Sequence, residues 1–199
     1  MRIPLQYQRT EYDCGPTSLL NAISFLFDRE DFPPDILRHC MFCTLDSYNE
    51  KGEAYKNGTS NMAMLFIACW LNEYARATKF PIRAETLKGM DVYISADCPI
   101  VKALKRGGAV VIRVFLDCAH YVTLTGVSDE GIELFDPYYR NTPFPEPEIS
   151  IIENKPFSAN RLVAFGHFNR EDNASYAFGP ISDRVAIILY NTSKTPIIP

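Results

Sequence analysis

One cysteine lies at the start of an apolar segment, where its thiol could act as a nucleophile. Cys14 follows Asp13 and precedes Gly15-Pro16, and residues 19–27 are rich in large apolar side chains. This pattern predicts a buried helix, and a proline is tolerated in the first turn of a helix. Free backbone N–H groups and the positive end of the helix dipole would favour the nucleophilic thiolate of Cys14. Most cysteines pack as small apolar residues in the core. The position of Cys14 between Asp13 and Gly15-Pro16 favours a reactive thiol over this packing role.

A nucleophilic cysteine needs a general base, and the base needs a residue that orients it. His120 begins an alternating segment that predicts a strand ending at Val127, and a short polar turn leads to a second strand that runs from Ile132 to Asp136. Pairing Val127 with Ile132 in this hairpin would bring His120 and Asp136 to the same open end. The sequence therefore predicts His120 as the base and Asp136 as the carboxylate that orients it.

These segments together resemble a known family. The motifs are Gln8, Asp13-Cys14-Gly15-Pro16 at a helix start, and His120-Tyr121-Val122 and Asp136-Pro137 on consecutive strands. They are similar to the bacteriocin-processing (double-glycine leader) cysteine peptidases and their stand-alone relatives. The similarity covers about the first thirty residues and the hairpin from His120 to Pro137. It implies a papain-like fold with Cys14 as nucleophile, His120 as general base, Asp136 as its orienter and Gln8 as the side-chain donor of the oxyanion hole.

The remaining histidines and cysteines are weaker candidates for the reaction than Cys14 and His120. A zinc site at His39, Cys40 and Cys43 is disfavoured because no second pair of ligands with suitable spacing follows. His39 is read as a helix-end residue, and His167 as a spare base without a following aspartate on a partner strand. The other cysteines are expected to be free thiols, and we expect no metal and no cofactor.

The expected architecture is a single α+β domain over residues 1–199. The helical half covers about 1–108, an antiparallel sheet covers about 109–190, and 191–199 form a loose tail. A polar segment at 46–59 is expected to be a surface loop near the cleft. Besides the nucleophile helix, we predict helices at 35–40, 62–76 and 99–108, an extended segment at 80–85, and strands at 109–116, 120–127, 132–136, 149–152, 161–168 and 185–190.

Composition restricts the class of protein. The chain has 199 residues, 47% of them hydrophobic, and a net charge of -4, which favours a folded domain and gives no sign of nucleic-acid binding. The longest apolar stretch, 62–71, is too short to cross a bilayer, and residues 1–7 do not match a signal peptide. We therefore expect a cytoplasmic protein with a peptide or peptide-like substrate and no membrane segment.

Three alternatives use the same residues. An acyltransferase or amidase would resolve the acyl-enzyme with an amine or another nucleophile instead of water. A peptide-binding relative would keep the motif without turnover, although all four predicted positions are filled. A peptidase could also act in trans on the cargo of a partner transporter.

Overall fold

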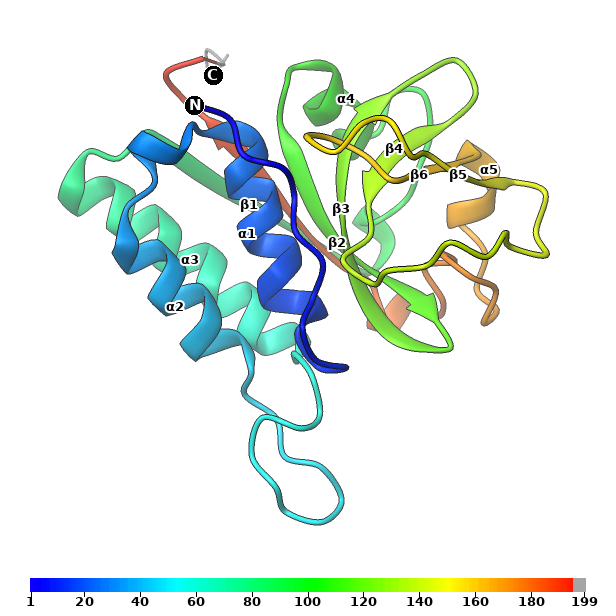
Figure 1. Cartoon of the computed structure of the whole chain (residues 1–199), viewed down its shortest axis with the longest axis horizontal. Coiled ribbons are helices and arrows are strands. Elements are labelled where there is room, and N and C mark those ends of the chain that lie inside the picture. Colours follow the sequence, from blue (N-terminus) through cyan, green and yellow to red (C-terminus); the bar gives the residue numbers. More distant parts are fainter. Residues whose placement is uncertain (195–199) are drawn as a thin grey trace.

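The computed structural model describes residues 1–194, and its helices lie on both faces of a curved sheet (Figure 1). The helices are α1 (Cys14–Leu26), α2 (Pro34–Thr44), α3 (Asn61–Thr78), α4 (Pro99–Lys105) and α5 (Phe165–Phe168). The strands are β1 (Ile82–Lys88), β2 (Ala109–Leu116), β3 (Cys118–Val127), β4 (Ile132–Phe135), β5 (Ile149–Ile151), β6 (Arg161–Val163) and β7 (Val185–Asn191).

Within the described residues, these strands form one seven-stranded sheet in the order β1-β7-β2-β3-β4-β6-β5. Every neighbouring pair is antiparallel. β2, β3 and β4 are joined by short turns, as expected for a meander. The hairpin of β3 and β4 has the predicted pairing of Val127 with Ile132. The observed fold therefore has the expected combination of helices and an antiparallel sheet.

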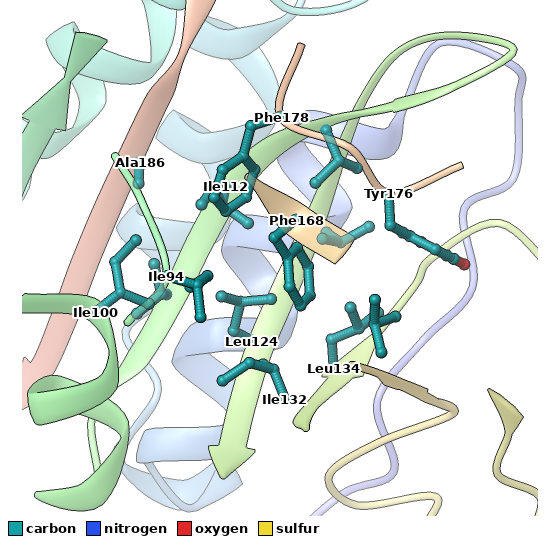
Figure 2. Close-up of a cluster of buried hydrophobic side chains, with 14 of the residues drawn as sticks. Ile94, Ile100, Ile112, Leu124, Ile132, Leu134, Phe168, Tyr176, Phe178 and Ala186 are labelled. Atoms are coloured by element: carbon teal, nitrogen blue, oxygen red, sulfur yellow. The ribbon is translucent and has the colours of Figure 1, made fainter. Parts of the chain in front are cut away.

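Side chains from opposite faces of the sheet enter two different cores. α1, α2 and α3 lie against one face, and their buried side chains form one cluster with residues of the sheet. α4 and the segment that leads to β7 help to cover the other face, and Figure 2 shows this second cluster. β2 alternates between them: Val111 faces the first cluster, whereas Val110 and Ile112 face the second. Because β2 is buried on both faces, it is an almost continuous run of apolar residues.

Three expectations about elements need correction. Residues 161–168 were expected to form one strand, but β6 ends at Val163 and α5 follows, so His167 lies in a short helical turn. Of the expected loose tail, Asn191 is the last residue of β7 and is buried, and its side chain donates to the carbonyl of Leu26 at 3.1 Å. Residues 195–199 of that tail lie outside the described residues. β1 belongs to the sheet although it lies within residues 1–108.

The length and hydropathy of the helices bear on whether any of them could cross a bilayer. Among residues 1–194, none of them combines the length and the apolar character that a bilayer crossing requires.

Candidate active site

Cys14 is the first residue of α1, as the sequence predicts. The helix is preceded by Asp13, whose carboxylate accepts from the Thr10 backbone N–H at 3.2 Å and from the Thr10 hydroxyl at 2.6 Å. The Asp13 carbonyl then accepts from the Thr17 N–H at 3.0 Å. Asp13 therefore shapes the turn that leads into the helix and leaves the first N–H groups of α1 beside Cys14 without a side-chain cap. Only 7% of Cys14 is exposed.

His120 and Asp136 meet at the open end of the β3–β4 hairpin. Their side chains are joined by a hydrogen bond of 2.8 Å between His120 Nε2 and Asp136 Oδ1, and both are buried. A bulge between Leu124 and Gly126 shifts the register of the two strands next to the turn. The hairpin register therefore brings together two residues that are sixteen positions apart.

α1 is fastened to β3 by two reciprocal hydrogen bonds. The Ser18 hydroxyl donates to the Tyr121 carbonyl at 2.8 Å, and the Thr123 hydroxyl donates to the Ser18 carbonyl at 2.8 Å. All three residues are buried, where neutral hydrogen bonds hold geometry firmly because the alternative is an unsatisfied polar group. The Tyr121 hydroxyl also donates to Asn61 at the start of α3, at 2.9 Å. These contacts fix the helix that carries Cys14 against the strand that carries His120.

His120 and Asp136 shift each other's pKa. Burial alone would lower the pKa of His120, but the Asp136 carboxylate and the Cys14 side chain outweigh burial and raise that pKa to about 10. Burial likewise favours neutral Asp136, but His120, the Tyr176 hydroxyl and the Tyr138 N–H together hold its pKa below the ordinary value. Because Nε2 of His120 bonds Asp136, Nδ1 is the ring nitrogen that remains for Cys14. The arrangement favours an imidazolium at His120 that is hydrogen-bonded to the Asp136 carboxylate.

Gln8 is tied to both sides of this site. Its backbone N–H donates to the carbonyl of Pro137, the residue after Asp136, at 2.8 Å. Its side-chain Nε2 donates to the Thr10 carbonyl at 2.8 Å, and its Oε1 is buried without a hydrogen-bond partner. An amide nitrogen carries two hydrogens, so one N–H of Gln8 remains for another acceptor.

Sequence reasoning missed the residues that hold Asp136. The Asp136 N–H donates to Asn160 Oδ1 at 2.7 Å, and Asn160 Nδ2 donates back to the Asp136 carbonyl at 2.8 Å. The Tyr138 N–H donates to Asp136 Oδ1 at 2.7 Å, and the Tyr176 hydroxyl donates to Oδ2 at 2.5 Å. Asn160 and Tyr176 belong to segments without a recognisable motif, so no pattern in the sequence indicates these contacts.

The spare histidines lie in other surroundings. His167 Nε2 donates to the Ser175 carbonyl at 2.6 Å, and the His39 ring stacks on Trp70 with 4.0 Å between ring centroids. Cys40 lies on the buried face of α2, and burial raises the pKa of its thiol to about 12. In the part of the chain that the structure describes, no three His, Cys, Asp or Glu residues are placed to hold a metal ion together.

A cavity borders α1. Its volume is about 620 Å³, and it lies between the N-terminal segment, α1 and α2. Asp13 and Thr17, the neighbours of Cys14 in the first turn, form part of its wall. Its apolar lining consists of Ile3, Tyr7, Leu20, Phe32, Pro34, Leu37 and Met41.

The segment 46–59 ends directly on the first turn of α1. A Cβ atom placed on Gly15 would lie 2.1 Å from the Thr59 hydroxyl and 2.6 Å from its Cβ. The base of the segment is held by Asp46, which accepts from the Ser60 N–H at 3.0 Å and from its hydroxyl at 2.5 Å. Ser60 in turn caps α3 by accepting from the Ala63 N–H at 3.0 Å. The segment is thus anchored next to Cys14 while most of its residues are exposed.

Gly15→Ala is expected to lower the free energy of unfolding by about 1–3 kcal/mol, because the added methyl overpacks the contact with Thr59. Gly166→Ala is the matched control, since a Cβ at this helical glycine meets no atom within 4 Å. Urea unfolding of both variants measures the difference, and Thr59→Gly in the Gly15→Ala background should restore part of the loss. Equal stabilities of the two alanine variants would contradict the close contact.

Comparisons with known proteins bear on this arrangement. The model of a family described as "Peptidase_C39 like family" matches residues 1–149. A solved structure described as a C39-like peptidase from Bacillus anthracis is 14% identical, covers 94% of each chain and has a TM-score of 0.53. Two structures of the peptidase domain of ComA, from Streptococcus and from Streptococcus mutans, are 16% and 14% identical. Both matches cover 94% of this chain. They cover 97% and 98% of the ComA peptidase-domain chains, and the TM-scores are 0.46 and 0.41. None of the curated proteins matches the chain.

Proposed function

The chain belongs to the Peptidase_C39-like family and has the papain-like α+β fold that its motifs imply. From this we propose that it is a cysteine peptidase, which hydrolyses a peptide bond through an acyl-enzyme on Cys14. The observation that carries the proposal is the buried pair of His120 and Asp136, 2.8 Å apart, with Cys14 beside it at a helix start. The papain-like fold alone would not decide between turnover and binding.

The proposed reaction begins with the thiolate of Cys14. It attacks the carbonyl carbon of the scissile bond, and the C–N bond breaks as the His120 imidazolium gives its proton to the leaving amine. A water molecule then attacks the thioester while His120 takes up a proton from it, and Cys14 is released. Asp136 keeps the imidazole oriented and stabilises its charged form throughout.

The tetrahedral intermediate requires donors for its oxyanion. We assign this role to the Cys14 backbone N–H, which lies at the helix start, and to the unused Nε2–H of Gln8. Each such donor is typically worth about 3–4 kcal/mol in the transition state. The hydrogen bond from the Gln8 backbone N–H to the Pro137 carbonyl supports this assignment, because it holds the Gln8 backbone next to the strand end that carries Asp136.

The proposed substrate is a small peptide or a precursor peptide. The cavity along α1 supports this, because it offers apolar walls that begin at the neighbours of Cys14 and continue to α2. An extended or helical peptide could lay apolar side chains into this space while its scissile bond reaches Cys14.

The proposal is tested by alkylation with iodoacetamide over a pH series, read by peptide mass. Cys69 and Cys118 are exposed whereas Cys14 is buried, so accessibility alone predicts that Cys14 reacts after both of them. We expect Cys14 to react first near neutral pH and to react more slowly in His120→Ala. If Cys14 reacted no faster than Cys69 and Cys118, the proposal would lose its basis and a peptide-binding role would take its place.

Hydrolysis itself is tested with an internally quenched peptide library. Peptide cleavage that depends on Cys14 supports the peptidase. If added amines took over the acyl group in preference to water, the product would identify an acyltransferase that uses the same residues.

A further inference from the structure

Tyr176 occupies an unusual backbone position beside the active site. It has a φ of 62°, in the left-handed region that bulky residues rarely adopt. Two hydrogen bonds hold it on β2: its N–H donates to the Phe115 carbonyl at 2.7 Å, and the Phe115 N–H donates to the Ala177 carbonyl at 2.8 Å. The side chain is fully buried and packs on the ring of Phe144, with 5.4 Å between ring centroids. Strained residues of this kind persist where the surrounding structure holds them, often at functional sites.

The ring of Tyr176 belongs to an apolar core, but its hydroxyl does not. Figure 2 shows the hydroxyl pointing away from the labelled apolar side chains. It donates to Asp136 Oδ2 at 2.5 Å, while His120 Nε2 and the Tyr138 N–H lie 2.8 and 2.7 Å from Oδ1. Each oxygen of the carboxylate is therefore held from its own side. A carboxylate fixed at both oxygens cannot rotate away from His120.

Arg161 acts on the same hydroxyl. Its guanidinium is buried and donates to the Asn160 carbonyl at 2.8 Å and to the Arg140 carbonyl at 3.0 Å. Burial and Asp136 raise the pKa of Tyr176, and the charge of Arg161 opposes them. A cation near the phenol oxygen favours the orientation in which the O–H points to Asp136. The phenol thus stands between a buried cation and a buried anion.

We propose that Tyr176 is a positioning residue of the active site, whose hydroxyl fixes the Asp136 carboxylate in the orientation and the ionised form that hold His120 against Cys14. This inference rests on the proposed function of the triad. Tyr176 lies beyond residues 1–149, the part that the family model matches. The segment between β6 and β7 therefore contributes to a site whose proposed nucleophile, base and orienting carboxylate all lie in the matched part.

The test is the acid limb of Cys14 alkylation by iodoacetamide in Tyr176→Phe, which removes one oxygen and keeps the ring. The hydroxyl helps to hold the pKa of Asp136 low, so without it Asp136 should take up its proton at higher pH. His120 then loses its counter-charge at that higher pH. We expect the midpoint of the acid limb to rise by about one pH unit.

Tyr190→Phe is the matched control, because Tyr190 is buried in the same core cluster and has no contact with Asp136 among the described hydrogen bonds. Its acid limb should stay at the wild-type position, and thermal melts at neutral pH report any loss of packing in either variant. In the Asp136→Asn background, Tyr176→Phe should cause no further shift.

An unchanged acid limb in Tyr176→Phe, together with slow alkylation in His120→Ala, would overturn the role of Tyr176 and leave the triad intact. A shift of the same size in the Asp136→Asn background would also overturn it, since Tyr176 would then not act through Asp136. If His120→Ala had no effect on the alkylation of Cys14, the proposed function itself would fail, and this inference with it.

Discussion

Replacing Cys14 by alanine is expected to reduce peptide hydrolysis by about 10⁴- to 10⁶-fold, because removal of the nucleophile ends covalent catalysis and leaves only binding and the oxyanion donors. The fold should survive, since Cys14 is a small side chain at the first residue of α1. The rate on an internally quenched peptide library measures the loss. Cys14→Ser, which keeps the shape but offers a poor nucleophile, should lose nearly as much.

Cys40→Ala is the control for this experiment. Cys40 is buried in the same core cluster as Cys14, so both substitutions remove a buried thiol, but only one removes the proposed nucleophile. Turnover should be unchanged in Cys40→Ala. Retention of more than about a tenth of the wild-type rate in Cys14→Ala would contradict the covalent mechanism.

The Cys14→Ala substitution should also change the pKa of His120. Cys14 is one of the two groups that raise the pKa of His120 to about 10, so that pKa should fall in Cys14→Ala. The sign for stability follows from linkage: a raised histidine pKa stabilises the fold below 6.5, and this contribution is lost as the pH rises through the folded value. NMR titration of the imidazole in both proteins measures the change.

The local elements of this chain follow from patterns over neighbouring residues. Density of apolar residues predicts α1 and α3, and alternation with a polar turn predicts the β3–β4 hairpin with Val127 opposite Ile132. Because a hairpin joins residues near in sequence, its register already places His120 and Asp136 at one end. The proximity of this pair is therefore predictable without knowledge of the rest of the fold.

Contacts between distant segments are not encoded in any local pattern. β7 is easily identified as a buried strand, but its insertion between β1 and β2 depends on how the complete sheet closes. The segment 161–168 is apolar enough for a strand, yet it turns into α5 after Val163. Tyr176 reaches Asp136 across forty positions from a segment with no regular structure. The contacts of such residues can be identified only from the folded structure.

Substitution of Asp136 should separate the charge of this residue from its hydrogen bonds. In Asp136→Ala, His120, the Tyr176 hydroxyl and the Tyr138 N–H all lose a buried partner, so the free energy of unfolding should fall by about 3–5 kcal/mol. Asp136→Asn can still accept from His120 and Tyr138, so most of this stability should return. Its activity should remain about 10²- to 10⁴-fold below wild type, because burial then lowers the pKa of His120 without an opposing carboxylate.

The pH dependence of stability distinguishes the charge of Asp136 from its hydrogen bonds. The lowered pKa of Asp136 stabilises the fold above its ordinary value of 3.8, and this contribution is lost as the pH falls through the folded pKa. The raised pKa of His120 stabilises it fully below 6.5, and this contribution is lost as the pH rises through about 10. The stability difference between wild type and Asp136→Asn, measured by urea unfolding, should therefore be largest between these two ordinary values and shrink on both sides. A difference independent of pH would show that His120 and Asp136 do not exist as an ion pair in the folded protein, because only the ionised pair ties stability to proton uptake at both residues.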